Sequence, residues 1–196
     1  MTSAHYDERT ALAVVDVQND FAHPDGSLYV QDGEQVIDVV NREVERALGA
    51  GAFVIYTQDW HPPDTPHFAK YGGKWPVHGV RDTWGAQLHA DLDVRGPQLH
   101  KAQGHEDGYS GFTVEHVETG EKASTGLEDV LREHGITDIV VVGLTTDYCV
   151  KETALDGIRL GFGVTVIRDA TRPVDLEPGD GERALQEIEA ADAKVI

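Results

Sequence analysis

The chain has 196 residues, 40% of them hydrophobic, and its 35 acidic against 16 basic residues give a formal net charge of −19. This charge disfavours nucleic acid and anionic membranes, because phosphate binding needs clustered Lys and Arg; we interpret it as a source of solubility, with attraction to a cationic partner as the alternative. A single cysteine excludes an internal disulfide, and a polar N-terminus and short apolar runs disfavour a signal peptide or a membrane span, so one cytoplasmic domain over residues 1–196 is predicted.

Apolar runs alternate with segments of helical periodicity along the chain. Strands are predicted, in order, at 11–18, 52–57, 97–102, 137–145 and 162–169, with a short last strand at 193–196. Helices are predicted at 33–51, 125–135, 146–161 and 180–192. Because the strands are apolar throughout, the pattern indicates an α/β fold of three layers, α/β/α, with a central, mostly parallel sheet of about five or six strands.

Reactive side chains follow several of these strands. Ligands of parallel sheets bind beyond the carboxyl ends of the strands. Asp16 ends the first strand, the irregular stretch 59–97 follows the second, Lys101 lies near the third, and the turn to Cys149 follows the fourth. Loops as long as 59–97 are usually functional in compact domains. Because neither a dinucleotide fingerprint nor a P-loop occurs, these side chains are the candidate site.

Cys149 lies where the strand in "VVVGLTTDYCV" gives way to a helix. With Thr146 as N-cap, Cys149 is the third residue of the first turn, where the helix dipole should lower the pKa of its thiol. The free N–H groups of this turn could also hold an oxyanion. The alternative is a buried structural cysteine, the commoner state of free Cys. As a nucleophile, Cys149 would need a carboxylate and a cation, and Asp16 and Lys101 are the candidates.

The segment "TQDWHPPDTPH" places Asp59, His61 and His67 close together, and "WPVH" adds His78. Imidazole and carboxylate groups bind first-row metals, and four such ligands leave room for water or substrate. Histidine-rich loops are often only solvated, so a single D-x-H pair would be weak. The cluster, stiffened by prolines, favours one divalent metal ion, with zinc as first choice and iron and manganese also compatible.

Taken together, these segments resemble the nicotinamidase branch of the isochorismatase-like cysteine hydrolases. The similarity covers about 10–170, in the order of the family. The matching segments are VVDVQNDF (14–21), GSL (26–28), TQDWHPPDTPHF (57–68), WPVH (75–78), HKA (100–102), YSGF (109–112) and VVGLTTDYCVKETALDG (141–157).

The resemblance implies a role for each matching position. It implies a catalytic triad of Asp16, Lys101 and Cys149, and a metal site of Asp59, His61, His67 and His78. It implies an oxyanion hole from the N–H groups of Thr145 and Cys149, beside a cis peptide between Leu144 and Thr145. Its substrate pocket falls on Phe21, Trp75, Tyr109 and Leu144. Two departures concern one pocket wall: Ala102 stands where the family often has glycine, and the stretch 103–108 is unusually polar.

The resulting hypothesis is hydrolysis of nicotinamide, and of pyrazinamide as a fortuitous substrate, through a thioester on Cys149. A homodimer is the generic expectation for such an enzyme. Two alternatives stay open. One is a relative acting on a ureido or carbamoyl amide or on isochorismate. The other is a binding module without activity, because fold alone never establishes function.

Overall fold

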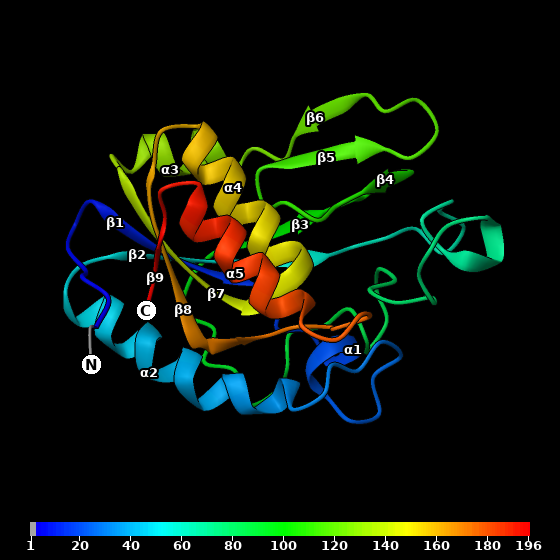
Figure 1. Ribbon diagram of the computed structural model, residues 1–196, viewed down its shortest axis with the longest axis horizontal. Coiled ribbons are helices and arrows are strands. Elements are labelled where there is room, and N and C mark those ends of the chain that lie inside the picture. The colour runs from blue at the N-terminus through cyan, green and yellow to red at the C-terminus, as the bar shows by residue number, and fades with distance from the viewer. Residues whose placement is uncertain (1–2) are drawn as a thin grey trace.

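The computed structural model describes residues 3–196 and shows a central sheet with helices on both sides (Figure 1). The strands are β1 Thr10–Val15, β2 Phe53–Asp59, β3 Gln98–Lys101, β4 Glu106–Asp107, β5 Thr113–His116, β6 Lys122–Ser124, β7 Asp138–Leu144, β8 Gly163–Arg172 and β9 Lys194–Val195. The α-helices are α1 Asn19–Ala22, α2 Val36–Gly49, α3 Leu127–Glu133, α4 Lys151–Arg159 and α5 Asp180–Ala190. A π-helical turn, Thr146–Val150, leads into α4, and short 3-10 turns occupy Gly33–Gln35 and Ala69–Tyr71.

The central sheet has six parallel strands in the order β3-β2-β1-β7-β8-β9. The predicted three-layer α/β fold with a mostly parallel sheet is therefore confirmed. The chain starts in the middle of the sheet, moves outward to β3 and then returns to β7 on the other side of β1. The carboxyl ends of β1, β2, β3 and β7 consequently lie next to one another. This order brings together Asp16, Asp59 and Lys101, which lie at the ends of β1, β2 and β3.

Each face of the sheet has its own apolar core, because the side chains of a strand alternate between faces. On one face, Leu12 and Val14 of β1 pack with the buried stripe of α2, which includes Val36, Val40 and Val44. The spacing of these valines places them on one side of the helix. On the other face, Ala11, Ala13 and Val15 pack against α3, α4 and α5. Buried residues therefore occupy both faces of β1, which explains its unbroken apolar sequence.

Two features of the fold differ from the sequence prediction. Residues 106–124 form a separate three-stranded antiparallel sheet, β4-β5-β6, where no strand was predicted. Its strands are two to four residues long and polar, so they carry no apolar periodicity. Strand β8 also runs on to Arg172 through an irregularity in its pairing with β7, beyond the predicted end at 169.

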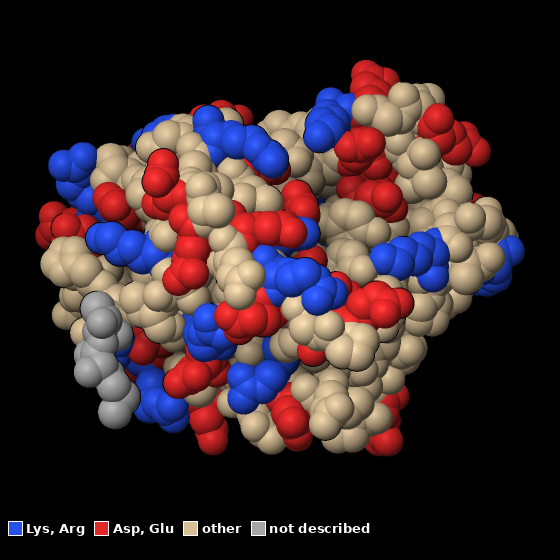
Figure 2. All heavy atoms as spheres, in the orientation of Figure 1, with Lys and Arg blue, Asp and Glu red and all other residues tan. Residues whose placement is uncertain are grey.

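The surface carries acidic and basic side chains interspersed on the face shown in Figure 2, rather than in one large acidic patch. This distribution is consistent with the interpretation of the net charge as a source of solubility. Within residues 3–196, no helix combines the length and the apolar character that crossing a bilayer requires.

Candidate active site

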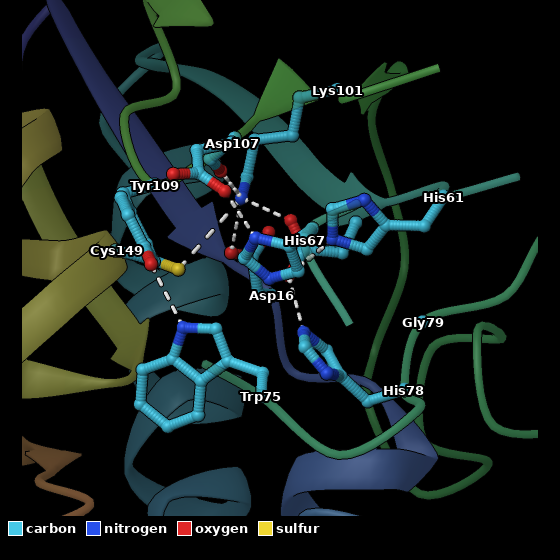
Figure 3. Close-up of polar contacts among 12 residues, drawn as sticks. Asp16, His61, His67, Trp75, His78, Gly79, Lys101, Asp107, Tyr109 and Cys149 are labelled. Carbon is cyan, nitrogen blue, oxygen red and sulfur yellow. Dashed lines mark hydrogen bonds and ion pairs between the residues drawn. The ribbon is translucent and has the colours of Figure 1, made fainter. Parts of the chain in front are cut away.

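Asp16, Lys101 and Cys149 meet in a buried cluster at the carboxyl edge of the sheet (Figure 3). The Lys101 Nζ atom lies 2.8 Å from Asp16 Oδ2 and 3.8 Å from Cys149 Sγ. Asp16 Oδ1 accepts a hydrogen bond of 2.7 Å from the Thr57 hydroxyl. Asp16 has a left-handed backbone, with φ of 48°, a conformation that non-glycine residues hold mainly at sites the surroundings over-determine. The structure thus brings together all three predicted triad residues.

Lys101 also contacts Asp59, which is its partner in the register of β2 and β3. The Lys101 Nζ atom donates to Asp59 Oδ1 at 2.5 Å and to the carbonyl oxygen of Gly108. Burial disfavours the charged ammonium, but Asp16 and Asp59 outweigh it and raise the pKa of Lys101 well above its ordinary value. The amine therefore stays charged and joins the triad to the predicted metal ligands.

The two carboxylates titrate at different pH values. Burial raises the pKa of Asp16 to about 6, against the opposing attraction of Lys101. Burial would also raise the pKa of Asp59, but Lys101 and the imidazoles of His61 and His78 hold it at about 2. Asp59 is therefore a permanent anion suited to a cation, while Asp16 can exchange a proton close to neutral pH.

The thiol of Cys149 is not acidified, contrary to the sequence prediction. The N-cap is Thr145, one residue earlier than expected, and Cys149 is the fourth residue of the π-helical turn. The turn is wide because the Val150 N–H donates to the Thr145 carbonyl oxygen at 3.0 Å, five residues back. Burial raises the pKa of the Cys149 thiol well above its usual range, and Lys101 only partly opposes this. Cys149 consequently rests as a thiol and needs a base to become a nucleophile.

His61, His67 and His78 form the second cluster, and each offers a ring nitrogen within 4.8 Å of the others. The Asp59 Oδ2 atom lies 3.9 Å from the Nε2 atoms of both His61 and His78. Burial lowers the pKa of His61 to about 3, and it also lowers the pKa of His78, so these imidazoles are neutral at pH 7. Neutral imidazoles and an ionised carboxylate are the protonation states in which these groups bind a metal ion.

The chemistry of these donor atoms also fits a metal ion. Three imidazoles and one carboxylate match the nitrogen and oxygen ligands preferred by zinc, iron and manganese.

The irregular segment that carries these candidate ligands is held by two buried polar side chains from the start of the chain. Gln18 Nε2 donates to the Asp59 carbonyl oxygen at 2.9 Å, and Gln18 Oε1 accepts from the Asp59 N–H at 2.8 Å. Asp20 Oδ2 accepts from the Gly79 N–H at 2.8 Å, and the Gly79 carbonyl oxygen in turn accepts from the His61 N–H at 2.8 Å. Sequence reasoning missed both positioning roles.

Between the two clusters lies a cavity of about 380 Å³, including its open side. All four predicted pocket residues line it, namely Phe21, Trp75, Tyr109 and Leu144, and so do Thr145 and Cys149. The peptide between Leu144 and Thr145 is cis, as the resemblance implied. The further lining residues Leu28, Gly108, Tyr148 and Val174 were missed. Val174 could have been found, because it follows the carboxyl end of β8, the one long strand whose end the prediction did not use.

The segment after Lys101, where the sequence departs from the family pattern, forms one wall of the site. Ala102 has a left-handed backbone, with φ of 55°, which explains why a glycine is favoured there. A Cβ placed on Gly108 would lie 2.6 Å from the Ala102 Cβ, so the two positions pack tightly. Tyr109 accepts a hydrogen bond of 2.8 Å from Trp75 Nε1. The wall is therefore intact with alanine in place of glycine.

The fold and the site together define an α/β protein with a buried Cys–Lys–Asp cluster beside a group of histidines that could hold a metal ion. Comparisons place it more closely. The isochorismatase domain family matches residues 10–196. The nicotinamidase of Escherichia coli K12 is 39% identical over 201 residues, which cover 93% of this chain and 92% of that protein.

Two solved structures are similar along almost their whole length. Pyrazinamidase of Pyrococcus horikoshii, in complex with zinc, has a TM-score of 0.84 and 36% identity, covering 96% of this chain and 98% of that one. PnC1 of L. infantum, in complex with nicotinate, has a TM-score of 0.88 and 31% identity, covering 100% and 96%. The chain belongs to the isochorismatase domain family. The predicted resemblance to the nicotinamidase branch is confirmed, and so is the prediction that the protein is an amidohydrolase.

Proposed function

We propose that this protein hydrolyses nicotinamide to nicotinate and ammonia. The observation that carries the proposal is the placement of the Cys149 sulfur and the three-histidine cluster on one cavity of about 380 Å³. The aromatic side chains of Phe21, Trp75 and Tyr109, which line this cavity, suit a flat aromatic ring. The names of the relatives, a nicotinamidase and a protein in complex with nicotinate, support the same substrate.

In this proposal, Asp59, His61, His67 and His78 hold one divalent metal ion, with zinc as first choice because a neighbour of similar structure is a zinc complex. When bound there, such an ion would supply a Lewis acid for the pyridine nitrogen of the substrate. Phe21, Trp75, Tyr109 and Leu144 orient the ring, so that the carboxamide carbon faces Cys149.

The chemistry at the carboxamide then belongs to the triad. The ionised Asp16 takes the thiol proton while the Cys149 sulfur attacks the carbonyl carbon. The N–H groups of Thr145 and Cys149 stabilise the resulting oxyanion. Lys101 holds Asp16 in place and stabilises the negative charge that develops beside it. The carbon–nitrogen bond breaks as Asp16 returns the proton to the leaving nitrogen, which gives ammonia and a thioester on Cys149.

A second half-reaction releases the product. Asp16 accepts a proton from a water molecule, which attacks the thioester carbonyl, and the oxyanion is again stabilised by Thr145 and Cys149. The carbon–sulfur bond breaks, the thiolate recovers the proton from Asp16, and nicotinate leaves. The wider proposal places the enzyme in the cytoplasm, as a homodimer, in the salvage of NAD.

Three ring amides test the proposal in one assay of ammonia release. Nicotinamide and pyrazinamide both offer a ring nitrogen in the same position, whereas benzamide has the same shape without it. We expect turnover of the first two and a kcat/KM for benzamide lower by on the order of 10⁴-fold, because a desolvated polar site left unpaired discriminates strongly. Hydrolysis of a ureido or carbamoyl amide with none of nicotinamide would contradict the proposal and favour the alternative within the family.

A further inference from the structure

The three histidines of the proposed metal site differ in what contacts the Nδ1 atom of the ring. His78 Nδ1 lies 2.7 Å from the Pro76 carbonyl oxygen. His61 Nδ1 has no partner within the described part of the chain. His67 Nδ1 contacts the carboxylate of Asp107, which is the last residue of β4 (Figure 3). Among residues 3–196, His67 is thus the member of the cluster whose Nδ1 atom contacts a charged side chain.

We propose that Asp107 is a positioning residue of the metal site. Its carboxylate accepts a hydrogen bond from the Nδ1–H group of His67. This bond leaves the Nε2 lone pair for the ion and fixes the plane of the ring. A carboxylate behind an imidazole also makes that imidazole a stronger electron donor. The inference rests on the proposed metal site, and it adds a residue that lies 40 positions from His67 in the sequence.

The balance of charge favours the same role. The carboxylates of Asp16, Asp59 and Asp107 are in contact with the joined clusters, whereas the side chain of Lys101 is the cation that contacts Asp16 and Asp59. A divalent ion would bring these charges to neutrality. The His67 side chain is 3% exposed and that of Asp107 is 34% exposed, so Asp107 completes the site from its rim without being fully desolvated.

The backbone around Asp107 explains how its position is maintained. Asp107 pairs with Glu115 in the small antiparallel sheet. Gly108, the next residue, accepts from Lys101 Nζ, and Tyr109 accepts from Trp75 Nε1. Three consecutive residues therefore contact a metal ligand, the triad lysine and the aromatic wall. The small sheet serves to hold this strip against both halves of the site.

The test measures metal affinity rather than activity. Each protein is stripped with a chelator, and zinc binding is then measured by competition with a chromophoric chelator. The variants are Asp107→Ala and Asp107→Asn, where asparagine keeps an acceptor without the charge. The control is Glu115→Gln, because Glu115 lies opposite Asp107, carries the same charge and contacts Lys122 rather than a histidine. Cobalt substitution adds a visible spectrum that reports the ligand set.

We expect Asp107→Ala to weaken zinc binding by about 10- to 100-fold, the range typical of outer partners of metal ligands. Asp107→Asn should lose less, and Glu115→Gln should stay within about twofold of the natural protein, because it leaves His67 untouched. The cobalt spectrum should change more in Asp107→Ala than in Asp107→Asn or Glu115→Gln. Equal zinc affinity of Asp107→Ala and the natural protein would overturn the inference and leave the proposed function intact. A natural protein that binds no zinc, iron or manganese would overturn both.

Discussion

The two halves of the site are built in different ways. The triad half is made of residues at the ends of parallel strands, where the register alone places Lys101 beside Asp59. The metal half lies on an irregular segment that is held by side chains, with Gln18 bonded to the backbone of Asp59 and Asp20 bonded to that of Gly79. Lys101 contacts both halves through Asp16 and Asp59. The difference teaches that the hydrogen bonds of the sheet position the proposed triad, while side-chain hydrogen bonds between residues remote in sequence position the proposed metal ligands.

The largest expected effect comes from Cys149→Ala, which removes the nucleophile and leaves the metal half in place. Turnover of nicotinamide should fall by on the order of 10⁴-fold or more, the scale seen when a nucleophile is deleted. Metal content should stay at the level of the natural protein. The measurements are ammonia release and elemental analysis. Near-normal hydrolysis in this variant would contradict the covalent mechanism.

The converse change is His61→Ala, which removes a ligand and leaves the triad in place. Metal binding should weaken by more than the roughly 10- to 100-fold loss typical of an outer partner. Substrate binding should weaken with it, because the ring nitrogen loses its partner. Elemental analysis and the KM for nicotinamide check both effects. A variant that kept its metal would show that His61 is not a ligand.

Lys101→Met tests the residue that connects the halves. It leaves the buried carboxylates of Asp16 and Asp59 without their cation, and breaking a buried pair in this way costs about 3–5 kcal/mol. The free energy of unfolding in urea should fall by about that amount. The control is Lys122→Met, whose Nζ lies 3.5 Å from Glu115 with 68% of the side chain exposed, and it should cost about 0–1 kcal/mol. Similar losses in the two variants would contradict the bridging role.

The pH dependence of the natural enzyme isolates the triad half. The pKa of Asp16 is raised to about 6, first by burial, and Asp16 must be ionised to accept the thiol proton. Above this pH the carboxylate of Asp16 is ionised, so its titration should no longer change the rate. Below it, kcat/KM for nicotinamide should fall tenfold per pH unit. A rate that stays constant from pH 7 to pH 5 would exclude Asp16 as the base.

The smallest effect concerns the wall between the halves. Gly108→Ala places a methyl group 2.6 Å from the Ala102 Cβ, and overpacking of this kind costs about 1–3 kcal/mol. Adding Ala102→Gly removes the opposing methyl and relieves a left-handed alanine, so the double variant should recover most of the loss. Unfolding free energies of the four proteins complete the cycle. Additive losses would show that the two positions do not interact.

Prediction from the sequence succeeded where a residue's position follows from its strand. The apolar runs located the strands of the central sheet, and the residues at the carboxyl ends of parallel strands lie at the same edge of the sheet. It failed for the short polar strands β4, β5 and β6, which have no periodicity to detect. It failed also for the pKa of Cys149, because a helix start was visible in the sequence but the depth of burial was not.

The order and apolar character of the segments were sufficient to give the layered sheet, the edge that carries the reactive groups, and the residue types available for a thiol reaction and a metal ion. Only the folded chain decided that Lys101 contacts two carboxylates, that burial raises the pKa of the Cys149 thiol despite the helix start, and that Asp107 contacts His67. The physical reason is that periodicity reports which side of an element is buried. Charge state and hydrogen-bond partners depend instead on distances between residues that are remote along the chain.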